Sequence, residues 1–283
     1  MPMTANDGVR IRWEERGAGE PVLLIQGLGY TLEMWHRVAP VLAAEFRVLM
    51  FDNRGVGGSD APPGPYAYPD MARDAIAVLD AAGVERAHVY GISMGGAIAQ
   101  QLVIDAPERV RSLVLGATYC GGPSFHLAEP EVYEALEARG RGTTPDQGAR
   151  LILPYIYDRA TPRERVEEDV AIRVRHYPSL QGYLGQAAAA LGWDATPGLG
   201  SIGVPTLVIR PESDRLVNPE NSREVAARIP GARLVSLPGA SHLYPSDRPA
   251  ESNALVLEFL REATAREVAA RGPAGRDAEA AAR

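Results

Sequence analysis

Short apolar runs alternate along this chain with segments whose apolar residues recur at helical spacing, and this alternation limits the possible folds more than any other feature. Buried strands are predicted for residues 21–26, 47–52, 87–90 and 110–116, and helices for 32–44, 70–82 and 94–105. Strands that are apolar on both faces and separated by helices belong to parallel sheets. This part of the chain is therefore predicted to form a mostly parallel, doubly wound α/β sheet.

The alternation stops near residue 121 and resumes near residue 201. The intervening segment shows no clear buried strand and consists of Ala-, Glu- and Arg-rich helical pieces with interleaved aromatic residues. Strands then follow at 205–209 and 233–237, and helices at 219–229 and 250–266. We expect an α/β core of residues 1–120 and 201–266, a helical cap of residues 121–200, and a flexible C-terminal tail of residues 267–283.

Charge and composition argue against several classes of function. The formal net charge of −7 disfavours a nucleic-acid-binding groove or a polybasic membrane patch. All 29 basic residues are arginine, so no lysine is available for Schiff-base chemistry or for holding a pyridoxal cofactor. The single cysteine, Cys120, allows neither an intrachain disulfide nor a thiolate cluster, and we expect it to be a small buried hydrophobe. We expect no cofactor and no metal ion.

The N-terminal residues are polar and charged, without the apolar centre of a signal peptide, and no run reaches 18 apolar residues. We therefore expect a cytoplasmic protein that does not enter a membrane. The sequence leaves the oligomeric state open, and a homodimer is one option.

The stretch Gly91-Ile92-Ser93-Met94-Gly95 lies where a predicted strand turns into a predicted helix. It fits the pattern G-x-S-x-G, in which a sharp, strained turn lifts a serine hydroxyl above the sheet. Side chains at positions 91 and 95 would collide with the turn, which favours glycine at both. The helix behind Ser93 directs its positive end at the site and so favours a developing negative charge. Ser93 is predicted to be a nucleophile.

A serine nucleophile needs a base, and His242 is the best candidate among the five histidines because it follows the last predicted strand. His88 lies within a strand and is expected to point away from the site. Asp214 follows another strand and is the predicted acid that orients His242, with Glu212 as its rival in the same loop. Ser93, Asp214 and His242 each follow the end of a strand, and such loops gather at one edge of a parallel sheet.

Two backbone N–H groups would complete this site as an oxyanion hole. One is predicted to come from Met94, directly after the nucleophile. The other is predicted to come from Leu28 in the loop "QGLGY", where Gly27 and Gly29 let the backbone approach a ligand closely.

Five stretches together resemble the α/β-hydrolase superfamily in its serine-nucleophile branch: "QGLG", "FDNRGVGGSD", "GISMGG", "SDRLVNP" and "GASHLYP". The resemblance covers residues 9–260 and is weakest in the insertion. It implies an α/β-hydrolase fold with a helical cap and no cofactor. The stretch from Asp52 to Ser59 is interpreted as a rigid structural loop. Many relatives have His-Gly where this chain has Gln26-Gly27, which leaves Gln26 available to contact a substrate or a water molecule.

The stretch "GISMGGAIAQ" is similar to enol-lactonases and small esterases, which implies hydrolysis of a small, partly apolar ester or lactone through an acyl-enzyme. Substrate contacts are expected from Gln26, Gly27, Tyr119, Tyr155 and Leu243, with cap aromatic residues forming an apolar wall. The same triad could instead serve perhydrolysis, carbon–carbon bond hydrolysis or a tailoring step in secondary metabolism. Leu243 weakens the carbon–carbon reading, because hydrolases of that kind commonly have Trp there. A non-catalytic ligand receptor is the third class, which an intact triad disfavours.

Overall fold

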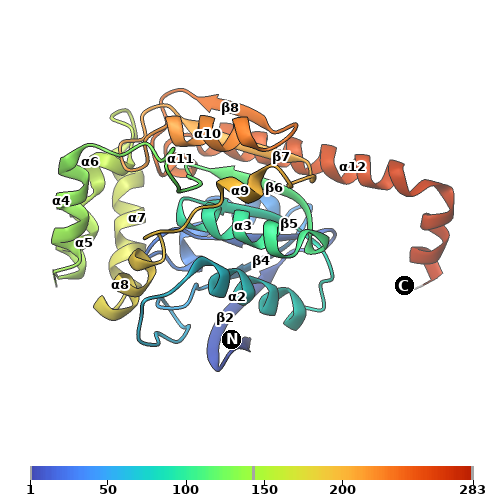
Figure 1. Ribbon diagram of the computed structural model, residues 1–283, viewed down its shortest axis with the longest axis horizontal. Helices are drawn as coiled ribbons and strands as arrows, with labels where there is room; N and C mark the ends of the chain where they lie inside the picture. The colour runs from blue at the N-terminus through green and yellow to red at the C-terminus, as the bar shows by residue number, and fades with distance from the viewer. Residues whose placement is uncertain (1, 142–143, 282–283) are drawn as a thin grey trace.

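A computed structural model describes residues 2–141 and 144–281, with side chains up to residue 270. At its centre lies an eight-stranded sheet in the order β1-β2-β4-β3-β5-β6-β7-β8 (Figure 1). The strands are β1 (Met3–Asn6), β2 (Val9–Arg16), β3 (Pro21–Ile25), β4 (Arg47–Phe51), β5 (Ala87–Ile92), β6 (Val110–Gly116), β7 (Thr206–Pro211) and β8 (Arg233–Leu237). Strand β2 runs antiparallel to both β1 and β4, and the remaining pairs are parallel. The predicted α/β fold class is confirmed.

Strands β1 and β2 were not expected from the sequence. Strand β2 reads VRIRWEER, and its only bulky apolar residues besides the terminal Val9 are Ile11 and Trp13. Between them Arg12 is also buried, because its guanidinium forms ion pairs with Asp52, Glu33 and Glu14. A buried charged residue interrupts the apolar run by which the other strands are recognised.

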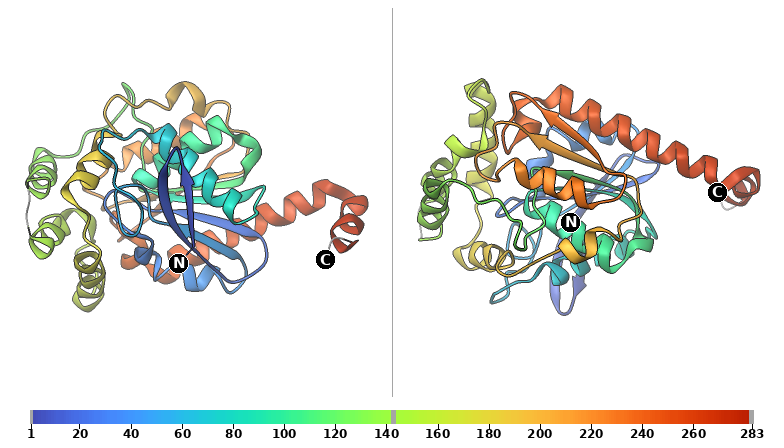
Figure 2. Two further views of the ribbon diagram at one scale, coloured as in Figure 1. Left: turned by 90° about the horizontal axis from the view of Figure 1, so that it is seen from below. Right: turned by 45° about the horizontal axis from the view of Figure 1, so that its top comes forward.

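Helices cover both faces of the sheet (Figure 2). One face carries α2 (Tyr68–Ala81), α3 (Met94–Asp105) and α10 (Glu220–Arg228), whose apolar residues join one core cluster. The other carries α1 (Ala39–Leu42), α11 (Tyr244–Asp247) and α12 (Pro249–Ala281), which join the second cluster. The helices therefore shield both faces of the central strands from solvent, which explains the continuous apolar runs of these strands.

Two predicted helices differ from the observed ones. The segment 32–44 forms a 3₁₀ turn, η1 (Leu32–Trp35), and the short helix α1, because Pro40 cannot donate a hydrogen bond within a continuous helix. Helix α12 extends well past residue 266, where the sequence predicted its end. The flexible tail expected for 267–283 stays a prediction, since side chains from residue 271 onward lie outside the described residues.

The insertion between β6 and β7 contains α4 (Pro130–Arg139), α5 (Pro145–Leu151), α6 (Leu153–Ile156), α7 (Arg163–Arg175), α8 (Leu180–Ala188) and α9 (Thr196–Leu199). Helices α4 to α8 stand together at one end of the sheet, and we call them the cap (Figure 1). An antiparallel bridge between Gly121 and Asp194 joins the two ends of the insertion. Leu199 of α9 belongs to the core cluster, so α9 packs with the sheet rather than with the cap.

No helix in the described part of the chain combines the length and the apolar character that crossing a bilayer requires.

Candidate active site

Ser93 occupies the turn between β5 and α3, with φ of 58° and ψ of −123°. A positive φ is rare for a residue with a side chain and marks a strained turn. A Cβ at Gly91 would lie 2.2 Å from the carbonyl oxygen of Gly95, and one at Gly95 would lie 2.0 Å from that of Ile25. The turn therefore requires glycine at both positions, as the sequence pattern predicts.

His242 and Asp214 lie on loops that follow β8 and β7. The Nδ1 atom of His242 is 2.8 Å from Oδ2 of Asp214, and both side chains are buried. The other oxygen of Asp214 accepts hydrogen bonds from the backbone N–H groups of Leu216 and Val217, each at 2.9 Å. A carboxylate can only accept, so Nδ1 of His242 carries the proton and Nε2 is left as a base.

The loop after β3 lies directly against the serine. A Cβ added at Gly27 would lie 3.2 Å from Cβ of Ser93, so the backbone of this loop touches the nucleophile. Neighbouring Gly29 donates its N–H to Oε1 of Gln186 in α8 at 2.8 Å, whereas no described residue accepts from the N–H of Leu28. The N–H of Met94, at the start of α3, has no acceptor within its helix. Both predicted oxyanion donors are thus available beside Ser93.

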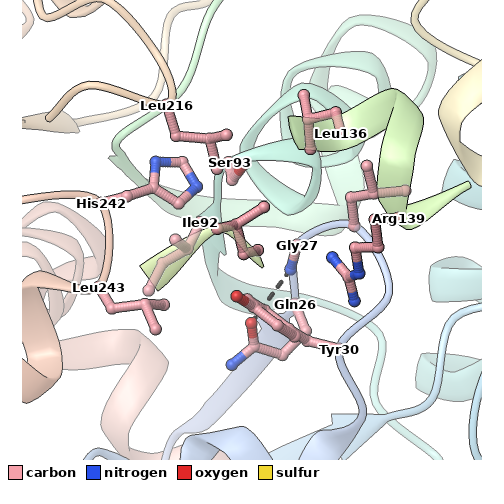
Figure 3. Close-up of a pocket in the computed structure, with 12 residues that line it drawn as sticks. Gln26, Gly27, Tyr30, Ile92, Ser93, Leu136, Arg139, Leu216, His242 and Leu243 are labelled. Atoms are coloured by element: carbon pink, nitrogen blue, oxygen red, sulfur yellow. Dashed lines mark hydrogen bonds between the residues drawn. The ribbon is translucent and has the colours of Figure 1, made fainter. Parts of the chain in front are cut away.

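Ser93 and His242 line one small cavity under the cap (Figure 3). Its volume is about 20 Å³, which is close to that of one water molecule. The wall is mostly apolar and combines residues from the sheet, from the catalytic loops and from the cap. It is lined by Gln26, Gly27, Leu28, Tyr30, Ile92, Ser93, Leu136, Arg139, Ile152, Leu216, His242 and Leu243.

Comparison with known proteins identifies the family. The sequence matches the family model described as alpha/beta hydrolase fold over residues 20–154. A candidate carbamate hydrolase, RutD, of Azorhizobium caulinodans is 33% identical, with 93% of this chain and 99% of that protein aligned. The chain belongs to the α/β-hydrolase family.

Two solved structures, of a lactonase and of an esterase, resemble this α/β-hydrolase over most of its length. The enol-lactonase from Burkholderia xenovorans is 30% identical with a TM-score of 0.82, covering 92% of this chain and 100% of the other. A thermophilic esterase from Thermogutta terrifontis is 28% identical with a TM-score of 0.80, covering 92% and 97%.

The predicted substrate contacts divide into two groups. Gln26, Gly27 and Leu243 line the cavity of this α/β-hydrolase, whereas Tyr119 and Tyr155 do not. The hydroxyl of Tyr119 is 2.6 Å from that of Tyr68, and its ring packs on Phe125 and Trp193. The ring of Tyr155 instead packs under the guanidinium of Arg215.

The sequence reading missed half of the cavity wall. Ile92 and Tyr30 lie within the stretches quoted for the serine turn and for the oxyanion loop, so their positions in those stretches could have indicated them. No sequence motif marks Leu136 and Arg139 of α4 or Ile152 before α6. The spacing of apolar residues along a helix does not show which of its turns faces the serine. We expected aromatic residues of the cap to form the cavity wall. Instead, this part of the chain contributes the aliphatic Leu136 and Ile152 together with Arg139.

Asp247 of α11 links the His242 loop to the cap. One carboxylate oxygen accepts from the N–H of Ser241 at 2.6 Å, and the other accepts from the N–H of Asp158 and the hydroxyl of Thr161. Burial raises the pKa of Asp247 to about 6, although these hydrogen bonds act in the opposite direction. The position of the predicted base is therefore tied to cap residues.

The loop through Asp52 supports the site without reaching the cavity. The Asp52 carboxylate accepts from the N–H groups of Leu32 and Gly58 and from Arg12, and it is fully buried. A Cβ at Gly57 would lie 2.2 Å from this carboxylate. These contacts agree with the structural role predicted for this loop.

His88 and Cys120 lie apart from the cavity. His88 is buried between Ser112 and Thr264, as expected for a residue that points away from the site. Cys120 is buried, and burial raises the pKa of its thiol to about 11. A thiolate is therefore scarce at neutral pH, which agrees with the expectation of a small buried hydrophobe.

Proposed function

We propose that this α/β-hydrolase cleaves a carboxylic ester or lactone of a small, partly apolar substrate, with Ser93 as nucleophile. The observation that carries the proposal is the 2.8 Å contact between His242 and Asp214, at a cavity where Ser93 stands on a strained turn. The similarity to an enol-lactonase and to an esterase supports the same substrate class.

In the first half-reaction, Nε2 of His242 takes the hydroxyl proton of Ser93 as its oxygen attacks the substrate carbonyl. Asp214 stabilises the imidazolium that forms and keeps the ring in the required tautomer. The N–H groups of Leu28 and Met94 bind the oxyanion, each contributing about 3–4 kcal/mol to transition-state stabilisation. His242 then gives the proton to the leaving alkoxide, and an acyl-serine ester remains.

In the second half-reaction, water enters after the alcohol group has moved away. His242 takes a proton from this water, whose oxygen attacks the acyl carbonyl, and the proton then passes to Oγ of Ser93. The acid leaves and the serine is restored. Gln26, at the cavity wall with its Oε1 already accepting from Gly27, is placed to contact the substrate or the water.

The first test is hydrolysis of 4-nitrophenyl acetate and butyrate by the wild type and by Ser93→Ala, together with labelling by a fluorophosphonate probe. We expect turnover and a covalent adduct at Ser93 in the wild type, and neither in the variant. Wild-type protein that shows no adduct and no turnover would support the ligand-receptor class instead.

Product analysis separates the other chemistries that use the same triad. The wild type is incubated with a simple lactone, with a β-diketone, and with an ester in the presence of hydrogen peroxide. We expect a ring-opened hydroxy acid from the lactone, no carbon–carbon cleavage of the β-diketone, and carboxylic acid in excess over peracid. Cleavage of the β-diketone at a higher rate than the lactone would overturn the proposal.

A further inference from the structure

Arg139 brings a positive charge to a cavity that is otherwise mostly apolar. It is the last residue of α4, it is 5% exposed, and it lines the cavity that contains Ser93 and His242. Apart from the predicted base and the weakly acidic phenol of Tyr30, it is the only ionisable side chain among the lining residues. In Figure 3 its guanidinium points from α4 toward the loop at Gly27.

No described carboxylate pairs with this guanidinium. Its Nε atom has no hydrogen-bond partner in the described structure, and its closest aromatic neighbours are the rings of Tyr183 and Tyr177, at 4.7 and 5.4 Å. The Tyr183 side chain also forms a hydrogen bond with Arg139. Aromatic faces and a phenol oxygen stabilise a buried cation only in part, whereas a carboxylate would supply an opposite charge and an acceptor for Nε. The cavity thus contains a positively charged side chain that no described carboxylate neutralises.

The loop that contains Gly27 and Gly29 contacts both Ser93 and Arg139. A Cβ at Gly29 would lie 3.0 Å from Nη2 of Arg139, and a Cβ at Gly27 would lie 3.2 Å from Cβ of Ser93. The Cα atoms of these two glycines are separated by two peptide units and so by at most about 7.6 Å. Both residues also line the same cavity, so one small molecule can place a carbonyl at Ser93 and a carboxylate at Arg139.

We propose that Arg139 binds a carboxylate of the substrate, so that the preferred substrate is an ester or lactone with a free carboxylate a few bonds from the scissile carbonyl. This inference rests on the proposed hydrolytic function. A guanidinium presents a planar fork of donors that matches a carboxylate, and exclusion of water by the cap strengthens the pair. Arg139 then determines specificity and takes no part in proton transfer.

The main experiment compares kcat/KM for matched esters. 4-Nitrophenyl hemisuccinate is paired with 4-nitrophenyl butyrate, which places the carboxylate on the acyl side. 3-Acetoxybenzoate is paired with phenyl acetate, which places it on the alcohol side. We expect the wild type to prefer the carboxylate member of at least one pair, and Arg139→Gln to lower that preference at least tenfold. Arg139→Lys should retain part of the preference, because lysine keeps the positive charge. It should not retain all of it, because lysine lacks the planar fork of donors.

Arg173→Gln is the matched control. Arg173 is another buried arginine of the cap, and no described carboxylate pairs with it either; it lies over the ring of Tyr30 and donates to the carbonyl of Ala149 at 2.8 Å. It does not line the cavity, so its loss should leave the preference ratio as in the wild type. Equal ratios in the wild type and in both glutamine variants would overturn the proposal and make Arg139 a packing residue of the cap.

A second measurement separates this inference from the proposed function, because it needs no turnover. Glutarate and the uncharged glutaramide are compared as protectants of Ser93 against the fluorophosphonate and as stabilisers in thermal unfolding. We expect glutarate alone to protect the wild type and to raise its Tm, with both effects lost in Arg139→Gln. Labelling of Ser93 without protection by glutarate would overturn the anion site alone, whereas stabilisation by glutarate without any labelling would overturn the hydrolase alone.

Discussion

At the scale of single residues, Asp214 is held from three directions. Two backbone N–H groups bind one of its oxygens, and Nδ1 of His242 binds the other. The carboxylate cannot turn without breaking these bonds, so the imidazole is fixed in one tautomer. Glu212, the rival acid in the sequence, is exposed and lies 3.7 Å from Arg210 instead.

Asp214→Asn tests the orienting role of this carboxylate. An amide at this position can donate to Nδ1, which favours the tautomer that has no base facing Ser93, and we expect kcat to fall by roughly 10³–10⁴. Glu212→Gln serves as the control and should change kcat less than threefold. Steady-state hydrolysis of 4-nitrophenyl butyrate measures both, and equal effects of the two substitutions would refute the assignment.

His88 makes the stability of the fold depend on pH. Its Nε2 lies 3.1 Å from Oγ1 of Thr264, which itself donates to the carbonyl of Leu260, so Nε2 carries the proton and Nδ1 accepts from Ser112. Burial lowers the pKa of His88 from 6.5 to about 4. In the unfolded chain His88 therefore binds a proton more readily than in the folded protein. The contribution of neutral His88 to the stability of the fold is present above pH 6.5 and is lost as the pH falls toward 4.

We expect the free energy of unfolding to fall by up to about 3 kcal/mol from this histidine between pH 7 and pH 4. Urea unfolding at a series of pH values measures the slope, which His88→Asn should flatten. His126 is exposed, so His126→Gln should keep the wild-type slope. A wild-type slope in the His88 variant as well would show that another group is responsible.

At the scale of elements, α8 of the cap rests directly on the loops of the core. A Cβ at Gly182 would lie 1.9 Å from the carbonyl oxygen of Gly55, so helix and loop touch through their backbones. One turn later the buried amide of Gln186 accepts from the N–H of Gly29 and donates to the carbonyl of Arg54. The cap thereby holds the loop that carries the predicted oxyanion donor Leu28.

Gln186→Leu should slow catalysis as well as weaken the cap. The change leaves two buried backbone groups without partners, at a cost of about 1–3 kcal/mol each, and releases the loop beside Leu28. We expect kcat to fall by about tenfold or more while KM changes less, because an oxyanion donor acts mainly in the transition state.

Gln181→Leu is the matched control on the same helix. Its amide donates to the carbonyl of Ala61 in an exposed contact, away from the cavity. Steady-state kinetics and urea unfolding of both variants separate the two effects. A loss of stability in Gln186→Leu without any change in kcat would identify Gln186 as an anchor of the cap only.

At the scale of the whole molecule, the cap closes over the ends of the parallel strands and leaves a cavity of only about 20 Å³. A substrate must therefore widen this space by moving side chains or the cap itself. An additional methylene group gains about 0.8 kcal/mol by leaving water, but displacing packed side chains costs about 1–3 kcal/mol. Small acyl groups are favoured by this balance.

Acyl-chain length tests the small size of the cavity. We expect kcat/KM for 4-nitrophenyl esters to be highest between acetate and butyrate and at least tenfold lower for octanoate. Leu136→Ala should shift the optimum to longer chains, because it removes part of the wall contributed by α4. A wild type that prefers octanoate would indicate that the cap opens freely.

How well a strand or a site residue could be predicted from the sequence depended on its burial and on its local chemistry. Strands β3 to β7 were found because both of their faces are apolar or nearly so, and β8 was predicted although it is partly exposed. Ser93 was found because its turn demands glycine on both sides. Strands β1 and β2 were missed at the antiparallel edge, where one face is polar and Arg12 is buried by ion pairs that its neighbours in sequence do not reveal.

The sequence by itself determined the alternation of strands and helices, the turn at Ser93, and the order in which Ser93, Asp214 and His242 follow their strands. These features depend on contacts between residues that are close in the chain or on a rule common to all parallel sheets. Only the tertiary structure decided that Arg139 and Leu136 face the serine while Tyr119 and Tyr155 do not. Helical spacing shows that a face is buried, but what covers that face depends on how separate segments pack.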